Sequence, residues 1–119
     1  MNNVEYNTKN LIRAIRTSNE YNHYHRVLEK IKQDENLYAG MNEYRKRCFL
    51  LQMGNDDTFF EDIARLRNEF KDIISNNLVS EFLIAEQRLN KMTRQVNASI
   101  LDCVNLDVGF LWNYVILLL

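Results

Sequence analysis

Apolar residues recur with a helical period along almost the whole chain, most clearly between Asn77 and Leu106. This stretch contains neither glycine nor proline, so it predicts one helix of about eight turns. A helix of this length spans about 45 Å, more than the width of a domain of this size. We therefore expect part of its apolar face to meet a second copy of the chain. The predicted self-association residues follow steps close to a heptad, and they are Leu78, Phe82, Leu89, Met92, Val96 and Ile100.

Four shorter amphipathic patterns precede the long helix and are separated by short polar turns. They predict helices over residues 4–16, 18–33, 35–53 and 58–75. The last two should form an antiparallel hairpin, and the long helix should fold back onto the fourth helix. The sequence thus predicts an all-α fold, an antiparallel bundle of about five helices. We expect one helical domain over residues 1–106, followed by a hydrophobic tail over residues 107–119.

Local signals predict how these helices begin and end. Two T-x-x-E sequences, Thr17–Glu20 and Thr58–Glu61, have the spacing of a capping box at a helix start. Gly54 suits a C-terminal position with positive φ. Asn76 and Asn77 are expected as the hinge that leads into the long helix, since asparagine tolerates the left-handed conformation of a tight reversal. Gly40 lies inside a predicted helix, where it favours a kink or the close approach of another helix.

The composition supports the helical prediction and narrows the functional classes. The chain is 46% hydrophobic and 26% charged, and it has three glycines and no proline. Its 15 basic and 16 acidic residues give a net charge of −1, so there is no general basic field to hold nucleic acid directly. Cys48 and Cys103 belong to no paired cysteine pattern, which indicates reduced thiols. No secretory signal or membrane-spanning run is present, and a cytoplasmic protein is expected.

The sequence contains no recognisable catalytic or metal-binding motif. His23 and His25 are two positions apart, so on a helix they point in different directions and are poorly placed to share a metal. The acidic residues of 56–62 lack the alternating pattern of a calcium loop and suit a helix N-terminus. Cys103 lies near the heptad pattern and is expected as a small buried side chain. We therefore expect a protein that is not an enzyme and needs no cofactor.

A basic stripe on the polar face of the long helix is the candidate partner-binding site. Arg88, Lys91 and Arg94 recur every three residues. Such a stripe is most often solvated or paired with nearby carboxylates, for which Glu81 and Glu86 are available. If the stripe is functional, it binds an acidic protein partner or, as an alternative, an RNA backbone, in which case binding would weaken with salt. A second basic group comprises Arg45, Lys46 and Arg47.

The apolar run from Phe110 to Leu119 differs from the rest of the chain. It is about half as long as a membrane-spanning helix. Exposed to water it would promote aggregation, so we expect it to be covered. The alternatives are the core, a subunit interface, another protein or a membrane surface, for which Trp112 and Tyr114 are suited.

The order of segments resembles the YlbF/YmcA family of small helical bacterial regulators. The similarity is carried by an S-x-E-Y-x-x-Y block from Ser18 to Tyr24, a D-E-x-L-Y step from Asp34, and the run from Val79 to Asn90. The resemblance implies a cytoplasmic, self-associating, non-enzymatic protein that controls competence, biofilm formation and sporulation. It also implies contacts with other regulatory proteins and with the membrane-anchored endoribonuclease RNase Y. Some members are associated with an iron–sulfur cluster, but this chain has only Cys103 near its end.

Overall fold

The computed structural model describes residues 2–54, 56–107 and 109–111, and all the regular structure within them is helical. The predicted all-α fold with a long C-terminal helix is confirmed. The elements in chain order are α1 (Asn3–Arg16), α2 (Asn19–Lys32), α3 (Glu35–Gly54), α4 (Phe59–Glu69), α5 (Lys71–Ile74), α6 (Asn77–Val104) and the 3-10 helix η1 (Gly109–Leu111).

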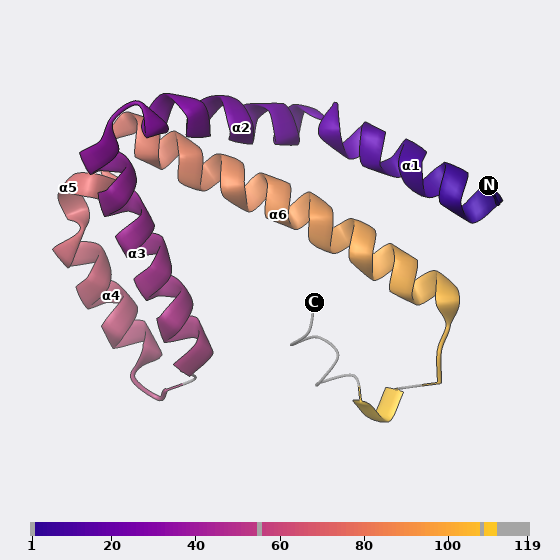
Figure 1. Cartoon of the computed structure of the whole chain (residues 1–119). Helices are drawn as coiled ribbons and strands as arrows, with labels where there is room; N and C mark the ends of the chain where they lie inside the picture. Colours follow the sequence, from indigo (N-terminus) through magenta and orange to yellow (C-terminus); the bar gives the residue numbers. More distant parts are fainter. Residues whose placement is uncertain (1, 55, 108, 112–119) are drawn as a thin grey trace.

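The helices form two arms that meet at one end of the molecule (Figure 1). In the long arm, α2 runs antiparallel to α6, and α1 continues nearly in line with α2. In the short arm, α3 runs antiparallel to α4. The short helix α5 lies at the vertex where the arms join. The molecule measures 50 × 37 × 16 Å, and its smallest dimension is little more than one helix with its side chains.

The predicted hairpin of the third and fourth helices is therefore present, but the predicted packing of the long helix along the fourth is wrong, since α6 contacts chiefly the last part of the predicted fourth helix, α5. Helix α6 packs mainly against α2, and it also contacts α5. The physical reason lies at the vertex, where α5 turns the chain away from α4. Helix α6 therefore starts beside α2 and runs along it, at an angle to the short arm (Figure 1). The helices pair in an antiparallel manner without closing into one compact bundle.

One small apolar cluster joins the two arms at their vertex. Its fully buried side chains come from α2, α3 and α6, and they are Val27, Ile31, Met41, Val79 and Phe82. Partly buried residues of the same helices and Ile73 of α5 surround them. Burial of each such side chain stabilises the fold by about 1.5–3 kcal/mol. The relative position of the arms thus depends on this vertex core.

The helix starts differ from the threonine caps that the sequence predicts. Ser18 caps α2, because its hydroxyl oxygen accepts a bond from the Tyr21 amide at 3.2 Å. The Thr17 hydroxyl instead donates to the Arg13 carbonyl oxygen one turn back, at 2.9 Å, a common competing bond for threonine. Thr58 precedes α4 without a side-chain cap and donates to the Asp62 carboxylate. Thr17 is therefore not the cap of α2, and Thr58 holds the N-cap position of α4 without the predicted side-chain bond.

The backbone hinges also move from their predicted places. Asn76 has φ −59° and caps α6 by accepting from the amides of Leu78 and Val79. Gly54 ends α3 without a positive φ; among the described residues that conformation occurs at Asn105, φ 53°, which follows α6.

The predicted fourth helix is broken in two, and the break brings α5 onto α3. Phe70 separates α4 from α5, with φ −101° and ψ 18°, and its ring lies 5.6 Å from that of Tyr44. A Cβ atom added at Gly40 would lie 2.7 Å from Cδ1 of Ile73. The close approach predicted at Gly40 is confirmed.

Replacing Phe82 with alanine should strongly destabilise the fold. Phe82 is fully buried in the vertex core, and removing a buried phenyl ring costs about 3–5 kcal/mol. The free energy of unfolding is measured by urea denaturation followed by circular dichroism. Ile84→Ala is the matched control, since Ile84 lies on the same helix and is 47% exposed; its cost should stay below about 1 kcal/mol. Equal effects of the two substitutions would contradict this core.

Candidate functional site

The apolar face of α6 is used in two different ways along its length. Helix α6 has 28 residues and α2 has 14, so they extend about 42 Å and about 21 Å. Val79, Phe82 and Ala85 are buried in the first half, and Leu78 packs against the vertex core. Two of the predicted self-association residues, Leu78 and Phe82, thus already pack within the chain.

Beyond Ala85 the same face of α6 contains no buried residue. We call the residues that continue it the distal face: Leu89, Met92, Val96 and Ile100. The first three are half-buried, and Ile100 is 46% exposed. Their spacing of three and four residues keeps them on one side of the helix. The distal face is a continuous apolar strip that the single chain covers only in part.

Helix α1 presents a second uncovered apolar strip. Val4, Leu11, Ile12 and Ile15 share one side of the helix by their spacing, and we call them the α1 face. No residue of α1 is buried, and Val4 is 76% exposed. Figure 1 shows the N-terminal end of α1 and the C-terminal end of α6 on the same side of the molecule, away from the vertex. A 14-residue helix is only marginally stable in water without packing. A surface that covers the α1 face would therefore stabilise this helix.

The three residues of the basic stripe are all exposed. The predicted local pairing with Glu81 and Glu86 is wrong, because other helices supply the partners of these carboxylates. Glu81 bonds to His23 of α2, with Nε2 and Oε1 2.9 Å apart, and Glu86 pairs with Arg45 of α3. In the part of the chain that the structure describes, Arg88, Lys91 and Arg94 form no ion pair. Their guanidinium and ammonium groups remain available.

Arg88 differs from the other two basic residues in its surroundings. It lines a shallow hollow of about 410 Å³ between α2 and α6, which we call the α2–α6 hollow. The remaining lining residues all belong to the first two turns of α2, and they are Asn19, Glu20, Asn22, His23 and Arg26. His23, one of these lining residues, forms the hydrogen bond to the Glu81 carboxylate that is the main cause of its lowered pKa. Sequence reasoning missed Arg26, which lies on another helix far from Arg88 in the chain.

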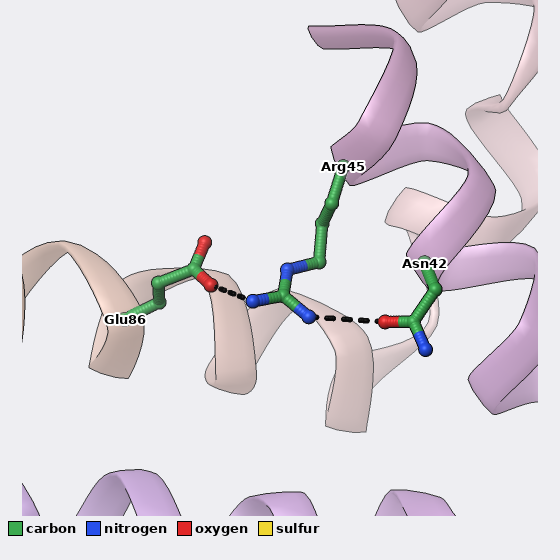
Figure 2. A network of polar contacts seen from close by, with 3 residues as sticks. All are labelled: Asn42, Arg45 and Glu86. Atoms are coloured by element: carbon green, nitrogen blue, oxygen red, sulfur yellow. Dashed lines mark hydrogen bonds and ion pairs between the residues drawn. The ribbon is translucent and has the colours of Figure 1, made fainter. Parts of the chain in front are cut away.

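A polar contact at the vertex links the short arm to α6 (Figure 2). The Arg45 guanidinium donates to the Glu86 carboxylate and to Oδ1 of Asn42, the latter at 3.0 Å. Its central carbon also lies 4.9 Å from the centre of the Phe82 ring, a favourable cation–π distance. Arg45 thus connects α3 with α6 at the edge of the vertex core.

The second basic group predicted from the sequence is mostly engaged within the fold. Arg47 pairs with Glu69 of α4 at 2.6 Å, and this bond lowers the pKa of the Glu69 carboxyl. The Arg47 guanidinium also lies 5.4 Å from the centre of the Phe70 ring. Together with Arg45, these contacts leave Lys46 as the exposed member of the group.

The remaining candidates show ordinary surroundings. His25 lies against the rings of Tyr21 and Tyr24, at 4.2 and 5.1 Å between centroids. Cys103 is exposed rather than buried, contrary to expectation, because the last turns of α6 lack a covering helix. Within residues 2–54, 56–107 and 109–111, no three His, Cys, Asp or Glu side chains gather where they could hold a metal ion.

The hydrophobic tail falls largely outside the described residues, including Trp112 and Tyr114. Of its described part, Phe110 is exposed and Leu111 lies in η1. Among the helices that the structure describes, none has the length and apolar character required to cross a membrane.

Comparison with known proteins gives one family match and distant relatives. The family model described as "Control of competence regulator ComK, YlbF/YmcA" matches residues 4–105. A UPF0342 protein of Caldicellulosiruptor bescii is 26% identical over 117 residues, covering 96% of this chain and 98% of the relative. A UPF0342 protein of Caldicellulosiruptor saccharolyticus is also 26% identical, with 89% and 91% coverage. No solved structure matches the chain, and neither the family nor these relatives indicate an enzyme class.

A double-mutant cycle should show that Arg45 and Glu86 stabilise the vertex together. The variants are Arg45→Ala, Glu86→Gln and the double substitution, compared by urea denaturation. Because both side chains are less than one-third exposed, their coupling should reach about 1 kcal/mol. The control cycle uses Arg47 and Glu69, which are more exposed and should be coupled more weakly. A larger coupling for the control pair would contradict the assignment.

Proposed function

The chain belongs to the YlbF/YmcA family, and we propose that it is a regulatory adaptor that acts through protein contacts in the cytoplasm. The family description, control of the competence regulator ComK, supports a regulatory role. The observation that carries the proposal is the apolar face of α6, which continues for about half the helix beyond the cover of α2. Such a face suits binding to another protein surface rather than catalysis.

The first contact in this proposal is with a second copy of the chain. The distal face consists of uncharged side chains, so two copies can bring the same surface together without repelling charges. This is what a two-fold symmetric interface requires. Its near-heptad spacing is typical of helices that pack along their length. The α1 face, which is uncovered on the same arm, supplies additional apolar surface to the second copy.

The second contact is with another regulatory protein through the basic stripe. By helical geometry, Lys91 and Arg94 point about 145° and about 155° away from the centre of the distal face, and Arg88 points about 85° away from it. A self-associated protein would therefore keep Lys91 and Arg94 exposed, with Arg88 at the edge of the interface. More specifically, we propose that the protein acts in developmental gene control and that its partner is the ribonuclease RNase Y, in RNA processing. It rests on the family and on the exposed cations.

Charge on the distal face should abolish self-association. We expect the wild-type chain to be a dimer or higher oligomer at micromolar concentration, and the double variant Val96→Glu, Ile100→Glu to be a monomer. Burying a carboxylate in an apolar interface has a large desolvation cost. Size-exclusion chromatography with light scattering measures the mass, and circular dichroism checks that the helices remain.

Ala98→Glu is the matched control for this experiment. Ala98 is exposed and lies on the side of α6 opposite to the distal face, so its variant should keep the wild-type mass. A wild-type chain that is a strict monomer would exclude self-association. An oligomer that survives the Val96 and Ile100 substitutions would place the interface elsewhere.

Charge reversal on the basic stripe should weaken partner binding without changing the oligomer. We expect Lys91→Glu with Arg94→Glu to lower the affinity for the soluble part of RNase Y by at least about tenfold, since two exposed cations are replaced by anions. Isothermal titration calorimetry measures the affinity. Lys46→Glu with Lys71→Glu makes the same change in net charge on other helices and should have little effect. Binding of wild-type protein to single-stranded RNA that weakens steeply with salt would favour the nucleic-acid alternative.

A further inference from the structure

We propose that the α2–α6 hollow binds a carboxylate side chain in an acidic segment of a partner protein. This inference rests on the proposed adaptor function and specifies the chemistry of its partner. It also extends the partner-binding surface, because it combines Arg88 of the basic stripe with residues of α2.

Two arginines on different helices face this hollow. Arg26 lies in the second turn of α2, and Arg88 lies in the middle of α6. Both are exposed, and neither forms an ion pair in the described part of the chain. A planar guanidinium donates two parallel hydrogen bonds to one carboxylate. A carboxylate in the hollow would therefore meet strong donors from both helices.

The antiparallel pairing of α2 with α6 keeps these two arginines near each other. The His23–Glu81 bond at 2.9 Å crosses the same helix pair. It engages Nε2 of His23 and one oxygen of Glu81, and the Glu81 carboxylate also interacts electrostatically with Arg26 and Lys30. Because Glu81 is committed to His23, the arginines of the hollow retain donors for an external group.

The other lining residues favour a peptide over a nucleic acid. Glu20 lines the hollow together with the two arginines, so the lining has a small excess of positive charge that suits a single carboxylate better than a continuous row of phosphates. Asn19 and Asn22 supply both amide donors and carbonyl acceptors, which match the alternating groups of a peptide backbone. The chain as a whole carries a net charge of −1, so it lacks the basic field that holds a polyanion. One or two carboxylates on a short segment fit this pattern of charge.

The site is tested with a defined peptide rather than an unidentified partner. The probe is a fluorescein-labelled decapeptide of alternating glutamate and serine, and its binding to the full chain is followed by fluorescence anisotropy at low salt. We expect wild-type binding tighter than about 1 mM. Arg26→Gln and Arg88→Gln should each weaken binding at least about tenfold, because each removes one guanidinium from the hollow. Lys46→Gln is the control, since it removes one exposed cation on α3, outside the hollow and the basic stripe, and it should remain within about twofold of wild type.

Two further controls separate the peptide from other anions. A decapeptide with glutamine in place of glutamate should not bind, and an unlabelled single-stranded oligouridylate should not displace the glutamate peptide. The inference is overturned if the wild-type chain binds the glutamate peptide more weakly than about 1 mM, if Arg88→Gln binds like wild type, or if the RNA displaces the peptide.

The same samples distinguish this inference from the proposed function. Light scattering on Arg26→Gln and Arg88→Gln should give the wild-type mass, since neither residue belongs to the distal face. Loss of peptide binding with an unchanged oligomer supports the hollow as a separate binding site. A monomeric wild-type chain would contradict the proposed self-association whatever the peptide does.

Discussion

The structure depends on one small apolar core at the vertex of two helical arms. Val27, Ile31, Met41, Val79 and Phe82 are fully buried there, and they come from the consecutive helices α2 and α3 and from α6, which is distant from them in the chain. Away from this vertex each arm is only one helix pair wide, so few side chains can be covered on all sides. The burial at the vertex must therefore hold the arms together, with the Arg45–Glu86 contact at its edge.

The difference in length between α6 and α2 gives the molecule its exposed surfaces. The apolar pattern of α6 is continuous, but α2 covers only its first half. The same residue type therefore has different roles along one helix: Phe82 stabilises the chain, whereas Ile100 remains available to another protein. The point where this change occurs lies beside Arg88 and the start of α2. In the proposed function, stability, self-association and partner binding are in this way distributed along a single element.

Several features could be predicted because they depend on neighbouring residues. The helical period predicted nearly every helix, and the missing side chain at Gly40 predicted a close approach, made by Ile73. The predicted capping bonds of the two threonines are not formed, although the T-x-x-E spacing is present. Thr17 has a competing acceptor in the Arg13 carbonyl oxygen, and the adjacent Ser18 takes over the cap. The split at Phe70 was also missed, since no glycine or proline marks it.

The sequence by itself determined that this chain is helical, that its last long helix carries a continuous apolar face, and that Lys91 and Arg94 lie on the opposite side of that helix. These properties follow from the spacing of residues along a helix, which is local. Only the tertiary structure decided that α6 lies against α2 instead of α4, that Glu81 and Glu86 are taken by His23 and Arg45, and that Arg26 comes beside Arg88. Such pairings depend on the direction that the chain takes after each turn and on which apolar faces then come into contact. A helical repeat specifies neither of these.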